Sequence, residues 1–130
     1  DLFLFKDLPF NARLRVARIC EVRPIEPGEV LARQDEIGSS MCIMVQGTVE
    51  VTRGSRRLAT LGAGEHFGEI ALLDEQPRSA TVTSRERGSM MTIRRDALME
   101  LCQREPGLGN RVLLSLATSL AHRLRDTSRA

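Results

Sequence analysis

The stretch HFGEIALLDEQPRSATV, residues 66–82, combines features that an ordinary strand does not explain. A glycine, Gly68, is followed at once by a carboxylate, Glu69, and then by a short apolar run. A single arginine, Arg78, comes nine residues after the carboxylate. Glycine lets a backbone approach another group closely, and the first N–H groups of a helix favour an anion. We therefore interpret GEIALL as a short helix whose beginning, together with Arg78, forms an anion site.

The overall composition bounds the class of protein. The chain has 130 residues, the size of one domain, which is enough to bury a core without metal or disulfide staples. Its formal net charge is only +2, which gives no general nucleic-acid footprint. No apolar run reaches the roughly 18 residues that span a bilayer, and the first residues lack the layout of a signal peptide. Because the chain opens with Asp1 rather than Met, we expect it to be a piece of a longer protein.

The cysteines and histidines do not form a metal or redox site. Cys20, Cys42 and Cys102 are odd in number, widely spaced and each set in an apolar stretch. This pattern argues against a disulfide framework, a CxxC pair or a zinc site, so we expect core cysteines and a cytoplasmic protein. His66 and His122 have no second ligand at metal spacing, and we expect both to be surface or partly packed side chains.

The spacing of apolar residues changes twice along the chain. Residues 10–20 place apolar positions, Leu14 among them, at helical spacing between arginines, which predicts a short amphipathic helix. Short alternating segments broken by Pro and Gly follow, and they indicate a small antiparallel barrel or sandwich. These segments are Val30 with Ala32, MCIMVQGTVEV, RRLATL, SATV and MMTI. Helical spacing returns after Ile93, with one helix containing Asp96 in its first turn and a longer one after Pro106.

Two glycines within the strand region have different meanings. Gly54 and Ser55 stand between two strand-like runs, VEVTR and RRLATL, and glycine in the first position suits a tight two-residue hairpin turn. Gly47 lies inside a strand pattern, where a glycine marks a bulge or a bend.

The chemistry around Arg78 fits a cyclic phosphodiester. Such a ligand has one negative charge, which needs a fixed cation and several N–H donors. Arg78 supplies a planar donor fork, and the start of the short helix supplies N–H groups. Glu69 would repel the phosphate, so we expect it to face away and accept a hydrogen bond from a ribose hydroxyl.

Taken together, FGEIALL and PRSATV resemble the phosphate-binding cassette of the cyclic nucleotide-binding domain family. This family occurs in bacterial catabolite-activator-type transcription regulators, kinase regulatory subunits and gated channels. IEPGEVLARQ resembles the family's early strand, CIMVQGTVEV its central hairpin, and PGLGNRVLLSLATSLAHRLR the long helix with which the bacterial regulators dimerise. Each motif alone is a weak signal, since a plain loop or surface turn has the same letters, but the combined spacing is specific. Asp35 stands in ARQDEIG where the family usually has glycine.

The resemblance implies how the cassette would hold the phosphate. Gly68, Ile70 and Ala71 would donate backbone N–H groups to the cyclic phosphate, and Arg78 with Ser79 would hold its oxygens.

The sugar and the base would meet other residues. The resemblance implies that Glu69 binds the ribose 2′-hydroxyl, and Phe67 belongs to the same ligand-binding motif. In RLRDTSRA, Thr127 and Ser128 are similar to the threonine and serine that reach the adenine in the catabolite-activator group.

The predicted fold class is α+β. It consists of an antiparallel β-barrel of the jelly-roll type, or double-stranded β-helix, with a short N-terminal helix and two C-terminal helices. The predicted single domain, 1–130, has a helical segment at 1–23, the barrel at 24–93 with the cassette at 67–82, and the C-terminal helices at 94–130.

The predicted function is that of a regulatory sensor rather than an enzyme. The sequence contains no GxSxG, HExxH or Walker loop, so we expect no catalytic residue, metal or cofactor. The expected ligand is cAMP, with cGMP as the other candidate. Occupancy would be relayed through the C-terminal helices to an output domain after Ala130, typically the DNA-binding domain of a transcription regulator.

We expect two copies of the chain to form a homodimer through residues 107–126. The seam between the two helices would contain Leu113, Leu116, Leu120 and Leu124. We expect no nucleic-acid contact by this chain itself and no membrane segment in it. Three alternatives stay open. The chain can be a ligand-independent dimerisation or protein-interaction module of the same fold, it can be the regulatory domain of a channel or kinase, or its site can take another anion.

Overall fold

A computed structural model of the chain describes residues 5 and 8–129, without the side chains of residues 123, 124 and 126–129. The helices and strands within these residues follow in the order α1 (Phe10–Ala17), β1 (Cys20–Ile25), β2 (Val30–Ala32), β3 (Ser40–Gln46), β4 (Val49–Arg53), β5 (Arg56–Leu61), β6 (His66–Phe67), α2 (Glu69–Leu73), β7 (Thr81–Ser84), β8 (Gly88–Arg94), α3 (Arg95–Arg104) and α4 (Pro106–Arg129).

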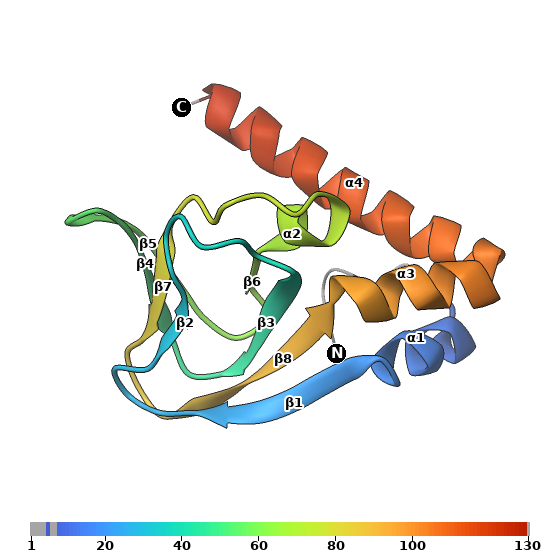
Figure 1. Cartoon of the computed structure of the whole chain (residues 1–130), viewed down its shortest axis with the longest axis horizontal. Helices are drawn as coiled ribbons and strands as arrows, with labels where there is room; N and C mark the ends of the chain where they lie inside the picture. The colour runs from blue at the N-terminus through green and yellow to red at the C-terminus, as the bar shows by residue number, and fades with distance from the viewer. Residues whose placement is uncertain (1–4, 6–7, 130) are drawn as a thin grey trace.

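The described strands form two antiparallel sheets of the jelly-roll type, with the orders β1-β8-β3-β6 and β2-β7-β4-β5. Helices α1 and α3 lie together at one end of the first sheet, and α4 passes over α2 (Figure 1). The predicted α+β class is confirmed in this arrangement of two antiparallel sheets and flanking helices, whereas closure into a barrel stays a prediction.

Strand β3 contributes to two separate hydrophobic clusters. Its side chains alternate between the two faces of the sheet, as they do in any strand. Met41 and Ile43 pack into a cluster with the helices, while Cys42 and Met44 pack into a cluster between the two sheets. Burial on both faces explains why this strand is one continuous apolar run.

The central hairpin agrees with the sequence pattern. Strands β4 and β5 pair in register up to Arg53 opposite Arg56, so Gly54 and Ser55 form the predicted two-residue turn. Gly47 follows a register irregularity in β3 and has a φ of 90°, which agrees with the predicted bend.

The N-terminal helix is shorter than the pattern indicates. It ends at Ala17, and Cys20 already begins β1 by pairing with Ile93, so a strand starts within the segment 1–23 that was predicted to be helical. Leu14 is also exposed, because the helix buries its other side through Ala12 and Val16. The backbone pairing with β8 overrides the helical spacing at the end of this segment.

One residue of the predicted dimer seam belongs to the domain's own core. Leu116 is fully buried, together with Val112 and Leu108, in the cluster between the helices and the first sheet. Its assignment to an intermolecular seam was therefore wrong, because α4 uses this face to pack onto α3 and the sheet. Leu113 and Leu120 lie at the edge of the buried face and are half-buried.

The three cysteines form no disulfide in this structure, and their surroundings fit the predicted core. Cys42 is buried between the sheets, while Cys20 and Cys102 are half-buried beside the helical cluster. Burial raises the pKa of the Cys20 thiol to about 11 and raises the pKa of Cys42 as well.

Replacing Leu116 with Ala tests its place in the core. Because a buried Leu→Ala change leaves a cavity, the free energy of unfolding should fall by about 2–5 kcal/mol. The control is Leu14→Ala on α1, where the side chain is 47% exposed and outside the proposed seam. Chemical denaturation should give a change of less than about 0.5 kcal/mol for this control. Equal effects of the two substitutions would contradict the assignment.

Candidate functional site

The predicted binding residues of the cassette line one cavity. The cavity has a volume of about 480 Å³ and lies between α2, β6 and the sheet that contains β4, β5 and β7. Seven residues named from the sequence contribute to its wall: Phe67, Gly68, Glu69, Ile70, Ala71, Arg78 and Ser79. Two segments that are separated in sequence are thus brought to a single place by the fold.

Helix α2 is a short helical turn that follows Gly68. Its apolar side packs against the rest of the domain. Gly68 has a φ of 83°, in the left-handed region that glycine adopts most easily. Leu72 is fully buried in the helical cluster and fixes the turn against β3. The N–H of Ala71 donates to the carbonyl of Gly68 at 3.0 Å. In this structure the N–H of Ala71 is therefore not free, and its contact with an anion stays a prediction, as do those of Gly68 and Ile70.

Arg78 is held in place by its backbone and by its side chain. Its N–H donates to the carbonyl of Glu36 and its own carbonyl accepts from the N–H of Asp35, both at 2.8 Å. The guanidinium Nη2 donates to the carbonyl of Ser40 at 2.9 Å. Among the residues that the structure describes, no carboxylate forms an ion pair with this half-buried cation. The guanidinium is fixed beside the cavity with its charge available to an anion.

Two glycines make room for the guanidinium. A Cβ atom on Gly38 would lie 2.5 Å from Nε of Arg78, and a Cβ atom on Gly68 would meet Nη1 and come within 2.9 Å of the Ser40 carbonyl. Gly38 was missed from the sequence, because nothing in ARQDEIG indicates which distant side chain would fill its space. Its only local signal is a glycine just before a strand.

The backbone of Asp35 has a positive φ, which explains why the family that this chain resembles usually has glycine at this position. Its φ is 72°, the one positive value at a non-glycine position within the described residues. Aspartate and asparagine tolerate this region better than other residues with a side chain. Aspartate in place of glycine can therefore adopt the same turn, in which the N–H of Asp35 binds the carbonyl of Arg78.

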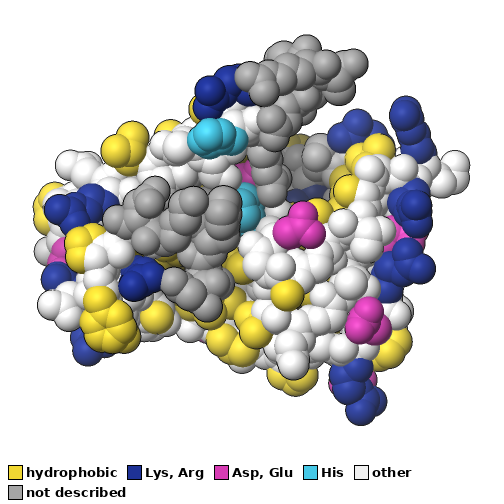
Figure 2. Space-filling view, turned by 180° about the vertical axis from the view of Figure 1, so that it is seen from behind, with side chains coloured by type: hydrophobic (Ala, Val, Ile, Leu, Met, Phe, Trp, Pro, Cys, Tyr) yellow, Lys and Arg dark blue, Asp and Glu magenta, His cyan; other side chains and the backbone are white. Residues whose placement is uncertain are grey.

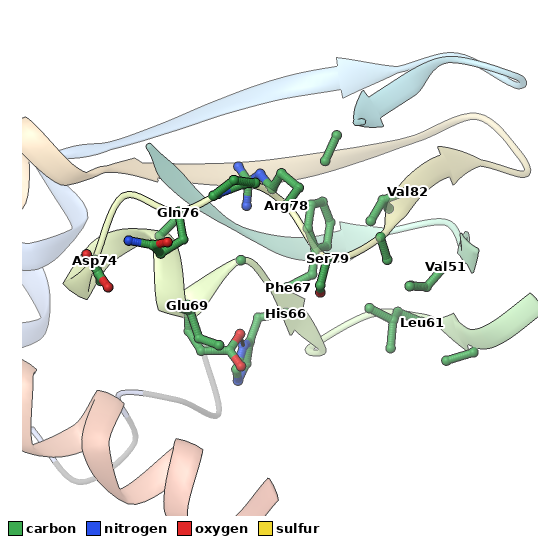
Figure 3. A pocket seen from close by; sticks show the side chains of 17 residues that line it. Val51, Leu61, His66, Phe67, Glu69, Asp74, Gln76, Arg78, Ser79 and Val82 are labelled. Atoms are coloured by element: carbon green, nitrogen blue, oxygen red, sulfur yellow. Dashed lines mark hydrogen bonds and ion pairs between the residues drawn. The ribbon is translucent and has the colours of Figure 1, made fainter. Parts of the chain in front are cut away.

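Glu69 faces a buried histidine. Glu69 is 4% exposed and its Oε2 lies 3.3 Å from Nδ1 of His66, which is 7% exposed. Figure 3 shows the two side chains turned toward each other and away from Arg78. The expectation of a surface or partly packed His66 was wrong, because β6 points this side chain inward beneath α4. His122 lies exposed on α4, as expected.

His66 also contacts the last helix. Its Nε2 lies 3.3 Å from Oγ of Ser119, a residue of α4 that does not line the cavity. This contact joins two elements 53 residues apart and could not be expected from the sequence.

The end of the cavity away from α2 is apolar. Val51, Leu61 and Val82 lie there on β4, β5 and β7, at a distance from Glu69 and His66 (Figure 3). The cavity therefore offers a cation and carboxylate on one side and an apolar wall on the other.

The β4–β5 hairpin is tied to the cassette by one direct hydrogen bond and by two more that run through Gln34. Nε of Arg53 donates to the carbonyl of Ser79 at 2.9 Å. The N–H of Gly54 donates to Oε1 of Gln34 at 2.8 Å, and the N–H of Gln34 donates to Oγ1 of Thr81 at 2.9 Å. These ties fix the hairpin beside the cavity and were not indicated by the sequence.

The other predicted features have a more limited structural account. The side chains of Thr127 and Ser128 lie outside the described residues, and only the backbone of α4 is given there. In the described part of the chain no three His, Cys, Asp or Glu side chains are grouped as metal ligands, and none of the helices is long and apolar enough to cross a membrane. On the face drawn in Figure 2, several described basic side chains lie along the right edge, and others are scattered over the rest of the face.

Residues 22–105 match the family model of the cyclic nucleotide-binding domain. The cAMP-dependent protein kinase regulatory subunit of Yarrowia lipolytica is 32% identical over 100 residues, which are 75% of this chain and 27% of that subunit. A cyclic nucleotide-gated potassium channel of Rhizobium etli is 36% identical over 90 residues, which are 69% of this chain and 25% of the channel. The chain thus spans about a quarter of the length of these relatives.

Two solved structures have the same fold over nearly the whole chain. The catabolite activator protein of Thermus thermophilus has a TM-score of 0.84 and 31% sequence identity, covering 96% of this chain and 59% of that protein. A cyclic nucleotide-binding domain from Methylobacillus flagellatus has a TM-score of 0.85 and 26% identity, covering 96% of this chain and 73% of that one.

Replacing Gly68 should cost stability for two reasons, its contact with Arg78 and its positive φ, and a second glycine allows the two costs to be measured separately. Gly68→Ala adds a methyl group against Arg78 and the Ser40 carbonyl, and it places alanine at a positive φ. Gly64→Ala is the matched control, because Gly64 has a φ of 86° but no atom within 4 Å of an added Cβ. Thermal or chemical unfolding should show a loss of about 1 kcal/mol for the control and a larger loss for Gly68→Ala. Equal losses would mean that the contact at Gly68 is relieved without cost.

Proposed function

Because this chain belongs to the cyclic nucleotide-binding domain family, we propose that it is a sensor that binds cAMP in the cavity beside α2 and reports occupancy through α3 and α4. The observation that supports this proposal best is the guanidinium of Arg78. It is fixed by Ser40, enclosed by Gly38 and Gly68, and without a carboxylate partner among the described residues. A held cation at the edge of an apolar cavity needs an anion with an apolar body.

The parts of a cyclic nucleotide have counterparts along the cavity. The cyclic phosphate would lie against Arg78, Ser79 and the N–H groups of Gly68, Ile70 and Ala71. The ribose lies toward Glu69, which can accept from a 2′-hydroxyl while it contacts His66, since a carboxylate accepts several hydrogen bonds. The base lies toward the apolar wall, and Thr127 and Ser128 of α4 are the proposed residues that reach it. The cavity volume falls within the range of about 300–1,000 Å³ of small-ligand sites.

The choice of purine rests on Ser79. A hydroxyl after the arginine is compatible with cAMP, and it can also reach the amino group of guanine in another orientation of the base. The relatives include cAMP-dependent and cGMP-dependent kinases, so both nucleotides are candidates. We propose cAMP. Calorimetric titration with both ligands tests this choice, and tenfold tighter binding of cGMP would overturn it.

The proposed output is a DNA-binding domain of a transcription regulator, reached through α4. The likeness to the Thermus catabolite activator protein covers 96% of this chain, including most of its C-terminal helix, and supports this output. We propose that a second copy packs along the outer side of α4. Leu114 and Ala117 are exposed there, beside the half-buried Leu113 and Leu120, and they take the place of Leu116 in the expected seam.

A ligand-independent interaction module of the same fold is the second candidate. The enclosed guanidinium argues against it, because an arginine without a ligand has no need of two glycines around it. Thermal unfolding with and without cAMP distinguishes the two functions, since a ligand that binds the folded state raises the midpoint.

Removing the cation should weaken cAMP binding strongly. Truncating one partner of a buried charge-assisted contact costs about 2–5 kcal/mol, so Arg78→Ala should weaken cAMP binding at least about 30-fold in calorimetry. Gly38→Ala should weaken binding less, because it displaces the guanidinium but keeps its charge. The control is Arg57→Ala, which removes an exposed arginine of β5 outside the cavity. An affinity of Arg78→Ala within threefold of wild type would exclude this site.

The proposed contact of Glu69 with the ribose is tested by comparing the binding of cAMP and 2′-deoxy-cAMP. If its carboxylate accepts from the 2′-hydroxyl, 2′-deoxy-cAMP should bind wild type about tenfold more weakly than cAMP. Glu69→Gln should show a smaller difference between the two ligands, whereas Glu100→Gln, an exposed change on α3, should leave the difference as in wild type. The same penalty in Glu69→Gln as in wild type would place the sugar elsewhere.

A further inference from the structure

The buried side chain of His66 bridges the proposed sugar site and the last helix. Its ring contacts Glu69 on α2 through Nδ1 and Ser119 on α4 through Nε2, each at 3.3 Å. We infer that His66 is a positioning residue that couples the carboxylate of Glu69 to the place of α4. Binding of the ribose 2′-hydroxyl and the position of α4 then depend on each other. This inference rests on the proposed function and names the internal connection through which occupancy is reported.

The chemistry of Glu69, His66 and Ser119 limits which group can donate and which can accept each hydrogen bond. An ionised carboxylate only accepts hydrogen bonds, so the proton must be on Nδ1 of His66 for this ring to bind Glu69. In a neutral imidazole the other nitrogen is then an acceptor. With a neutral ring and an ionised Glu69, the hydroxyl of Ser119 would donate to Nε2 and Nδ1–H would donate to Oε2 of Glu69. We propose that this contact with Ser119 favours one tautomer of His66 and contributes to holding the ring toward the carboxylate.

Burial gives these contacts energetic weight. His66 and Glu69 are 7% and 4% exposed, so water has little access to replace a lost partner. Strand β6 and helix α2 are both held against β3, whereas Ser119 belongs to a helix that packs on the domain along one face only. A shift of α4 would remove the hydroxyl from Nε2, and with it one of the contacts that hold the ring toward Glu69. Since such couplings are reciprocal, a ligand held by Glu69 favours the position of α4 that keeps Ser119 in contact.

The coupling is tested by measuring two ligands on variants of α4. We expect Ser119→Ala to weaken cAMP binding about fivefold but to change 2′-deoxy-cAMP binding less than about twofold, because the effect acts through the 2′-hydroxyl. Ser119→Thr keeps the hydroxyl and should restore the wild-type ratio of the two dissociation constants. The matched control is Thr118→Ala, an exposed hydroxyl one position earlier on the same helix, which should leave both constants unchanged.

The outcomes separate this inference from the proposed function. Equal weakening of both ligands by Ser119→Ala would indicate a merely structural contact and overturn the coupling. A wild type that binds both ligands equally well would also overturn it, because no 2′-hydroxyl contact would exist to be coupled. Absence of binding of either nucleotide to the wild type would instead remove the proposed function itself.

A spectroscopic measurement gives an independent test. The chain has two histidines, so nitrogen-15 spectra of the ligand-free protein with neutral imidazoles can be assigned with a His122→Ala variant. We expect His66 to carry its proton on Nδ1, and Ser119→Ala to lower the population of this tautomer. A wild-type His66 with the proton on Nε2 would contradict the inference.

Discussion

The guanidinium of Arg78 is the group around which the site is organised. It needs an open space between two backbone segments, and Gly38 and Gly68 provide that space because neither has a side chain. It also needs a fixed acceptor, which is the carbonyl of Ser40 at the start of β3. The turn at Asp35 and the turn into α2 are thus parts of one arrangement. Any change that fills the space or moves β3 acts on the charge that faces the cavity.

A second constraint keeps the carboxylate of Glu69 apart from the guanidinium of Arg78 within the cassette. Arg78 and Glu69 come from the two ends of one short segment, and a direct ion pair between them would neutralise both. In this fold Glu69 turns toward His66 instead, on the side of α2 nearest α4 (Figure 3). The cation remains available to an anion, and the carboxylate becomes the part of the site that is connected to the C-terminal helix.

The sequence predicted the local features well and the long-range contacts poorly. The β4–β5 turn and the helical turn after Gly68 depend on nearby residues, which the sequence displays directly. The grouping of residues 67–71 with 78–79 followed from a resemblance with specific spacing. The enclosure of Arg78 by Gly38 and the contact of His66 with Ser119 depend on how distant segments cross, for which neither spacing nor composition gives a signal. Leu116 was misassigned because a wide apolar stripe does not reveal which of its edges meets the protein's own core.

Strand β3 separates two hydrophobic clusters and belongs to both. Cys42 and Met44 support the sheets around the cavity, while Met41 and Ile43 support the helices at the other end. Neither half can lose its packing without exposing one face of the same strand to water. The half around the cavity and the half with the helices are therefore expected to unfold as one cooperative unit. Stabilising either half should then protect the backbone amides of the other from hydrogen exchange.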